Sequence, residues 1–418
     1  MAESDGGSPR FHYAWVIMVM AILVVFASLG LARFGYSIVL PAMQQGLGMD
    51  STQAGVLATT NLLGYMALAA VGGALASHLG PRMVISVGLA VAGLGMLLTG
   101  LAHSFPEAAA WRALTGVGSG ASNVPVMGLL VGWFAARRRG LAAGVAAAGS
   151  SVGLILLGPA VPPILAASGA DGWRICWFAF GALALLLALL STLLLRNRPE
   201  DLGLHPLGST TAMPATAPAA RQALRWGTVY RAAAVWHLGF VYVAFGFSYI
   251  IYMTFFVKGL VSDGGYTPRA AGNLFMVMGW CSLLCGVIWG AVSDHIGRKA
   301  ALVLVYVIQG TAFALFALWP QPAGYTLSAV LFGLTAWSIP AIMAAACGDT
   351  LGGRLAPAAL GFITLFFGIG QALGPTVAGA MADATGSFSA AMLLAAGVAA
   401  VGALGAAALR PTAREEAQ

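Results

Sequence analysis

Long apolar runs, separated by short polar or glycine-rich stretches, extend over most of the 418-residue chain. A helix needs about 20 apolar residues to cross a bilayer, and twelve such runs are present. They predict membrane-spanning helices near residues 15–40, 52–76, 83–102, 108–134, 141–166, 173–195, 233–257, 268–292, 300–319, 322–347, 355–382 and 387–409. The pattern therefore predicts an all-α polytopic membrane protein with twelve transmembrane helices.

The composition agrees with this pattern. Hydrophobic residues make up 60% of the chain and charged residues 8%, whereas about 25% of residues are charged in soluble globular domains. The N-terminal segment 1–10 carries Glu3 and Asp5 and lacks a basic leader. Because the first apolar run is also longer than the roughly 7–15 apolar residues of a cleaved signal, we expect it to remain as the first span.

Basic residues are distributed unequally between the two sides of the predicted bundle. With the N-terminus inside, fifteen of the 20 Lys and Arg residues lie on the inner side, and the outer side holds only Arg174, Lys258 and Arg269. Because basic loops stay in the cytoplasm, we expect a multi-pass protein of the cell inner membrane with both termini cytoplasmic. Anionic lipid headgroups account for the net charge of +7, so no nucleic-acid partner is expected.

A short charged turn occurs twice in the chain. The later copy, GAVSDHIGRK, begins at Gly290, and the earlier copy, GALASHLGPR, begins at Gly73, 217 positions before it. A long apolar chain with a half-length repeat is built from two copies of one membrane unit. We therefore predict an N-terminal six-helix half at 1–195, a cytoplasmic linker at 196–231 and a C-terminal six-helix half at 232–418, and we expect a monomer.

The repeated turn resembles the loop between the second and third helices of the major facilitator superfamily, whose pattern is G-x-x-x-D-R-x-G-R-K. The later copy keeps Asp294, Arg298 and Lys299, whereas the earlier copy has Ser77 in place of the acid and ends at Arg82. The resemblance implies the major facilitator fold, with two pseudo-symmetric halves. It also implies that Asp294, Arg298, Lys299 and Arg82 gate the inner side through charge pairs and contacts with helix ends.

A second segment narrows the resemblance. The run that starts at Arg198, R-P-E-D-L-G-L-x-P, is similar to bacterial carriers related to oxalate/formate antiporters and monocarboxylate transporters. Carriers of the oxalate type use cationic residues in the eighth and eleventh spans. Neither predicted span has one here, so specificity for an oxalate-like dianion is not expected.

The sequence gives no support for catalysis, ATP-driven transport or a metal site. Its two lysines lie outside any G-x-x-x-x-G-K-[ST] phosphate-binding motif, and its six histidines lie in loops or near span ends. The G-x-S-x-G match at 149–153 lies in an apolar helix rather than in the strand-turn-helix that a nucleophile requires. Cys281 and Cys285 are one helical turn apart but lack nearby ligands for a metal. We expect a secondary transporter, not an enzyme, with no cofactor and no metal.

Two arginines lie within predicted spans, where charge is costly and marks candidate functional sites. Arg33 lies about 10 Å before the predicted end of the first span, and Arg112 opens a fourth-span sequence, R-x-x-x-G-x-G-x-G, that resembles the family's motif there. All 13 acids lie at or outside the membrane edges. A guanidinium pairs with a carboxylate through two hydrogen bonds, which predicts an anionic solute. Structural alternatives are snorkelling of Arg33 to the interface and helix–helix contacts for Arg112.

Polar and aromatic residues on shared helix faces complete the candidate binding site. Tyr242, Phe245, Tyr249 and Tyr252 form an aromatic stripe, which either packs or lines a polar cavity that satisfies the hydroxyls. The other residues pair at helical spacing on the second, fourth, eighth and eleventh spans. The predicted substrate-binding residues are Arg33, Tyr36, Asn61, Tyr65, Arg112, Asn123, Tyr242, Tyr249, Tyr252, Asn273, Trp280 and Gln371.

These features predict a secondary active transporter of small organic anions, monocarboxylates in particular. The two halves would rock about a site near the membrane midplane. No acid lies within a span to carry a proton. Transport would therefore be coupled either to a proton that travels with the substrate (proton symport) or to exchange for another anion. The alternative transport function is efflux of drugs or other amphiphilic compounds, which an aromatic cavity also serves. A receptor or scaffold function has no soluble domain to support it.

Overall fold

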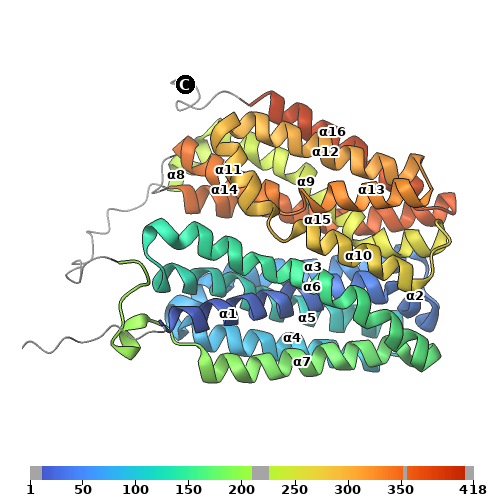
Figure 1. The fold of residues 1–418 in the computed structure, drawn as a ribbon, viewed down its shortest axis with the longest axis horizontal. Coiled ribbons are helices and arrows are strands. Elements are labelled where there is room, and N and C mark those ends of the chain that lie inside the picture. Colours follow the sequence, from blue (N-terminus) through green and yellow to red (C-terminus); the bar gives the residue numbers. More distant parts are fainter. Residues whose placement is uncertain (1–11, 210–225, 352–354, 410–418) are drawn as a thin grey trace, which may run out of the picture.

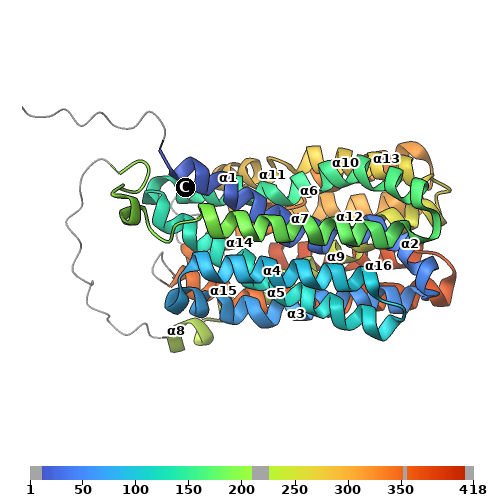
Figure 2. The same ribbon diagram turned by 90° about the horizontal axis from the view of Figure 1, so that it is seen from below.

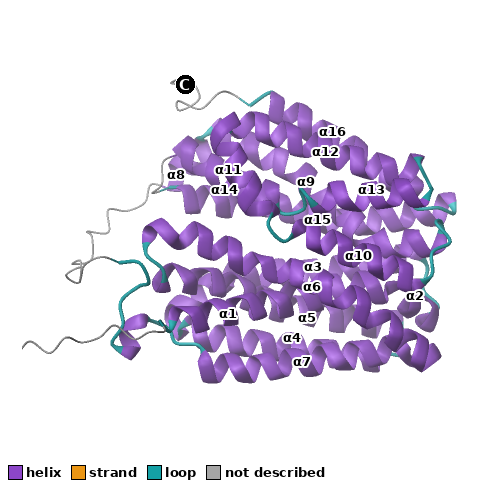
Figure 3. Ribbon diagram, viewed as in Figure 1, coloured by secondary structure: helices purple, strands orange, loops and turns teal. Residues whose placement is uncertain are grey.

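The structure is a computed structural model that describes residues 12–209, 226–351 and 355–409. The described part is almost entirely helical, and its only β-type contact is an isolated bridge between Phe134 and Leu207 (Figure 3). The helices before residue 196 are α1 Ala14–Val25, a π-helix Phe26–Phe34, α2 Gly35–Leu47, α3 Ser51–Leu79, α4 Pro81–Leu101, α5 Phe105–Trp133, α6 Arg139–Ser168 and α7 Gly172–Leu194.

A second set of helices follows the linker region. It comprises α8 Trp226–Arg231, α9 Ala233–Ser262, α10 Pro268–Ser282, α11 Cys285–Ile296, α12 Arg298–Leu318, α13 Pro322–Gly333, α14 Ser338–Leu351, α15 Ala356–Thr385 and α16 Ser389–Ala407. The two sets form adjacent bodies: α1–α7 occupy the lower part of Figure 1 and α9–α16 the upper part, with the long helices roughly parallel (Figures 1 and 2). The fold therefore consists of two helical halves, as the fold class predicts.

The described residues supply twelve membrane crossings. Nine helical segments are long and apolar enough to span a membrane, and two further pairs qualify when each bent pair is taken as one span. One of the nine, the 56-residue segment Arg139–Leu194, contains both α6 and α7, which are joined at the turn Gly169–Asp171. At 1.5 Å per residue it is far too long to cross once. It crosses twice, which agrees with the sequence.

The first span is longer than predicted. A continuous helical segment of 34 residues runs from Ala14 to Leu47, and Pro41 lies inside it. The predicted end at residue 40 is therefore wrong, because the helix continues through the proline. Arg33 consequently lies 14 residues before Leu47, about 21 Å along the axis. This is roughly twice the distance between Arg33 and the end of the helix that the sequence indicated.

Two predicted spans are each divided into two helices. The eighth consists of α10 and α11, bent by 42°, and the tenth of α13 and α14. Pro340 lies in the first turn of α14 and has no N–H to continue a preceding helix. Other groups occupy the carbonyls at this break: the Trp289 indole donates to Leu334 O (2.8 Å) and the Gln309 amide to Thr335 O (3.0 Å). The sequence analysis missed both breaks.

Each end of the bundle is defined by its turns. We call the end at which α1 begins and α16 ends the terminal end, and the end at which α2 ends and α3 begins the far end (Figure 1). Contacts between the halves include a close approach of α6 to α10. A Cβ added to Gly158 would lie 2.4 Å from Gly272 O, so only glycine fits there. At this point the two halves are in direct backbone contact, through α6 and α10.

Part of the predicted linker packs on the N-terminal half. The Leu207 N–H donates to Trp133 O (2.9 Å), and the Ala135 N–H donates to Leu207 O (3.2 Å). The rest of the linker that the sequence predicts, residues 210–225, lies outside the described residues, as do residues 1–11 and 410–418 at the predicted cytoplasmic termini.

Candidate substrate-binding site

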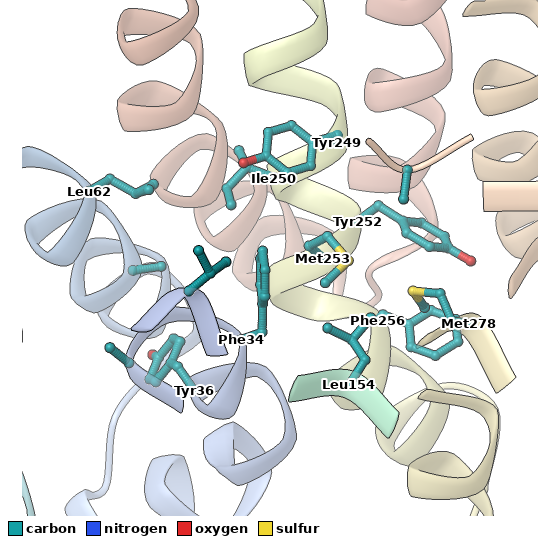
Figure 4. Close-up of a cluster of buried hydrophobic side chains, with 14 of the residues drawn as sticks. Phe34, Tyr36, Leu62, Leu154, Tyr249, Ile250, Tyr252, Met253, Phe256 and Met278 are labelled. Carbon is teal, nitrogen blue, oxygen red and sulfur yellow. The ribbon is translucent and has the colours of Figure 1, made fainter. Parts of the chain in front are cut away.

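A small cavity lies between the two halves. Its walls come from the first span, α3 and α5 of the N-terminal half and from α9 of the C-terminal half. They consist of Arg33, Phe34, Tyr36, Ser37, Ala58, Asn61, Leu62, Arg112, Ile250, Met253 and Thr254. In Figure 4, Phe34 lies among Leu62, Ile250 and Met253, which belong to both halves. The cavity is therefore placed where relative movement of the halves would change its walls.

Arg33 is the charged group of this cavity with the fewest partners. It lies in the last turn of the π-helix Phe26–Phe34. Its Nε and Nη2 atoms are buried and have no hydrogen-bond partner within the described part of the chain. Its guanidinium carbon lies 5.6 Å from the centre of the Tyr65 ring. This half-buried cation therefore keeps two donors available for an acceptor.

Arg112 has a different environment. It is 1% exposed, and its Nη1 donates to Ala32 O at 2.6 Å. Its guanidinium carbon lies 4.8 Å from the Tyr36 ring and 4.9 Å from the Trp177 ring, within cation–π range. The carbonyl that it binds belongs to the π-helical segment that carries Arg33. Arg112 therefore lines the cavity and also supports this segment.

Two polar residues near Arg112 hold the N-terminal wall together. The Tyr36 hydroxyl donates to Ala54 O (2.7 Å), and the Asn61 amide donates to Arg112 O (3.1 Å). Both side chains are buried. Each bond joins two different helices, which fixes the positions of α2, α3 and α5 around the cavity.

Two further polar pairs lie near Arg33, one in each half. The Asn123 amide donates to the Tyr65 hydroxyl at 2.8 Å, and Asn123 Oδ1 is buried without a partner among the described residues. In the C-terminal half, the Gln371 amide donates to the Tyr249 hydroxyl. Tyr249 is close enough to Arg33 and Tyr65 to interact with them electrostatically. The structure thus brings together polar candidates from four spans.

The aromatic stripe of α9 divides into two environments. Tyr242 stacks on Phe367, with ring centres 4.6 Å apart, and Phe245 stacks on Tyr249 at the same distance. Tyr252 instead packs among phenylalanines of the C-terminal half: Phe256, Phe313, Phe316 and Phe332. Its hydroxyl lies 2.6 Å from the Ser328 hydroxyl. Packing therefore accounts for Tyr252. Tyr242 and Tyr249 instead lie near Tyr65, and Tyr249 also lies near Arg33.

The remaining predicted residues of the eighth span lie apart from the cavity. Asn273 and Trp280 are both exposed, Trp280 by 58%, so they share a face as the sequence predicted. Neither belongs to the cavity walls in the described structure. Their buried neighbours Gly272 and Gly279 face α6.

Among the described residues, the contacts of the predicted gating residues lie within single halves. Arg298 binds Asp294 (2.5 Å) and Asp349 (2.9 Å), which joins α11, α12 and α14 at the terminal end. Arg82 donates from Nε to Thr192 O at 2.8 Å, which joins α4 to α7. Lys299 is half-buried beside Arg298.

Several of these residues were missed by the sequence analysis. Asp349 lies two residues before the end of α14, and a lone acid at a span end gives no signal of its partner. Phe34 and Met253 line the cavity but are indistinguishable from packing residues in the sequence. No cluster of three or more His, Cys, Asp or Glu side chains suited to a metal ion occurs within the described ranges.

Comparison with known proteins places the chain among membrane carriers. Residues 25–407 match the family described as "Uncharacterised MFS-type transporter YbfB". The chain is 24% identical to the "Probable sulfoacetate transporter SauU" of Cupriavidus necator, over 93% of this chain and 92% of that protein. It is 26% identical to human monocarboxylate transporter 11, over 94% and 82%.

The fold has solved counterparts. A bacterial homologue of the human lysosomal transporter Spinster superposes with a TM-score of 0.77 at 16% identity, covering 96% of this chain and 97% of that structure. This likeness concerns the fold. It agrees with the all-α arrangement of two helical halves described above.

Proposed function

Because this chain belongs to the MFS-type transporters, we propose that it carries small organic anions, monocarboxylates in particular, across the cell inner membrane by alternating access. The observation that carries this proposal is the Arg33 guanidinium, which faces the cavity between the halves with two unused buried donors. No acid lines the cavity in the described structure. A bound carboxylate would supply both the missing acceptors and the missing charge.

The unused guanidinium donors favour a single carboxylate bound at Arg33. Arg112 already donates to Ala32 O, lies against two aromatic rings and, within the described residues, leaves only Nε of its buried donors without a partner. Arg33 lacks partners for two buried donors in the described structure. The side chains of Asn123 and Gln371, which pair with the tyrosines near Arg33, are neutral amides. These features favour a monocarboxylate as the substrate.

The placement of the cavity supports transport by relative movement of the halves. The first span, α3 and α5 provide one wall and α9 the other, so rocking of the halves would open the site to each side in turn. Anion binding would neutralise Arg33 and remove the cost of an unpaired buried cation. With no acid among the described cavity walls, coupling would use a proton carried with the substrate or exchange for another anion. The distribution of basic residues supports cytoplasmic termini.

Uptake into proteoliposomes tests this proposal. We expect saturable uptake of radiolabelled C2–C6 monocarboxylates, competition among them, and weaker uptake of dicarboxylates. Fluorescent cationic dyes serve as the comparison panel, and protein-free liposomes are the control. Transport of the dyes without transport of any carboxylate would contradict the proposal and favour efflux of amphiphilic compounds.

A further inference from the structure

One acid makes a polar contact between the halves at the far end. Asp383 of α15 accepts hydrogen bonds from the Ser51 N–H (2.9 Å), the Thr52 N–H (2.7 Å) and the Thr52 hydroxyl (2.6 Å). These donors belong to the first turn of α3. Since α15 lies in the C-terminal half and α3 in the N-terminal half (Figure 1), a carboxylate of one half caps a helix of the other.

The local cap of α3 leaves these donors unused. The first N–H groups of a helix have no partner within it. Asp50 accepts only from the Gln53 N–H (2.7 Å), while the Gln53 side chain accepts from the Asp50 N–H (3.2 Å). The N–H groups of Ser51 and Thr52 bind Asp383 instead. The helix N-terminus is therefore fully capped only while the two halves are together, and its positive dipole end favours the carboxylate.

The backbones of the same two helices also meet closely. A Cβ on Gly379 would lie 2.1 Å from Ser51 O, and a Cβ on Gly55 would lie 2.1 Å from Pro375 O. The contact is thus built without side chains, which lets Asp383 reach the end of α3.

The opposite end of the bundle lacks a comparable charged contact among the described residues. Its ion pairs, Arg298 with Asp294 and with Asp349, lie within the C-terminal half. Polar contacts across the halves continue instead along α3 and α15, where the Thr59 hydroxyl lies 3.0 Å from the Thr376 hydroxyl. The described charged contact between the halves is therefore at the far end.

We propose that Asp383 is a positioning residue of the transport cycle: it holds the far end closed and leaves α3 each time that end opens. The proposal rests on alternating access, as proposed above, but not on the identity of the substrate. Asp383 is exposed and its three donors are only partly buried, so water competes for the contact. A contact of moderate strength biases the equilibrium towards closure and still breaks in every cycle.

A disulfide trap measures closure of the far end directly. The Thr59→Cys, Thr376→Cys variant is purified in detergent and oxidised with copper phenanthroline, and the linked peptides are followed by mass spectrometry. Adding Asp383→Asn removes the charge and one acceptor oxygen, so we expect the initial cross-linking rate to fall about three- to tenfold, which matches the usual energy of a helix cap. Asp383→Ala, which removes the whole carboxylate, serves as a second variant.

Asp263→Asn is the matched control. Asp263 caps the start of α16 at the same end, accepting from the Phe388 N–H (2.7 Å) and the Ser387 hydroxyl (2.8 Å), but all three residues belong to the C-terminal half. We expect its cross-linking rate to equal that of the parent. A parental rate in both Asp383 variants, or an equal fall in Asp263→Asn, would overturn the proposal. Cross-linking needs no substrate, so the result is independent of the carboxylate assay.

Discussion

At the scale of single residues, the two intramembrane arginines differ in what they bind. Among the described residues, Arg33 has two buried donors without partners. Arg112 has one, its Nε, and is enclosed by Tyr36, Trp177 and Ala32 O. The cost of charge in a membrane indicated both residues in the sequence. The difference between them could not be predicted, because it depends on a π-helical segment that has no sequence signature.

Thermal stability should separate these two roles. Arg112→Met removes the donor to Ala32 O in a fully buried site, so we expect a loss of about 1–3 kcal/mol in unfolding free energy and a lower melting temperature in detergent. Arg33→Met removes a cation with unused donors, and we expect an unchanged or higher melting temperature. Equal destabilisation by the two variants would contradict the assignment.

The tyrosines of α9 could not be assigned to the site from the sequence either. The spacing of Tyr249 and Tyr252 predicts one shared helix face. In the structure, however, Tyr249 pairs with Gln371 and Tyr252 with Ser328. Whether a face lines a cavity or a helical core depends on the neighbouring helices. Periodicity therefore identified the polar positions but could not assign them to the site.

At the scale of elements, the twelve apolar runs were sufficient to predict the spans, since each crossing must satisfy its own backbone within a helix. The internal breaks were not predictable from hydropathy. The break between α13 and α14 lies where the Trp289 and Gln309 side chains, distant in the sequence, donate to the carbonyls of Leu334 and Thr335. The match to G-x-S-x-G proved to be helix packing: a Cβ on Gly153 would lie 2.5 Å from the Gly30 Cα.

The contacts of Arg298 give an element-scale prediction. Asp349 is 18% exposed and Asp294 59% exposed, and a better shielded pair contributes more. If α11, α12 and α14 move as one gating unit, Asp349→Asn should slow turnover severalfold, and more than Asp294→Asn, with little change in KM.

The measurement is initial uptake rate against substrate concentration in proteoliposomes. Asp171→Asn is the control, because its pair with Arg174 has a carboxylate that is 78% exposed. Turnover of Asp349→Asn equal to that of the control would remove the gating role.

At the scale of the whole molecule, the repeat in the sequence predicted the two halves, and the structure adds how they meet. Contacts between α3 and α15 run from Ser51 and Asp383 at the far end to Thr59 and Thr376, and residues next to Thr59 on α3 line the cavity. The sequence could not place Asp383, because its partners are more than 300 positions earlier in the chain. A carrier with a central anion site and a closed far end is the account that joins these features.

The most direct test of this account is carboxylate flux through Arg33→Gln. At subsaturating substrate, reconstituted Arg33→Gln should carry the transported monocarboxylate at about one tenth of the parent's rate or lower. The reason is that a charged hydrogen bond contributes roughly 1.5–3 kcal/mol. Arg33→Lys should restore the flux only in part, since an ammonium lacks the two-pronged geometry. Flux through Arg33→Gln equal to that of the parent would contradict the central claim.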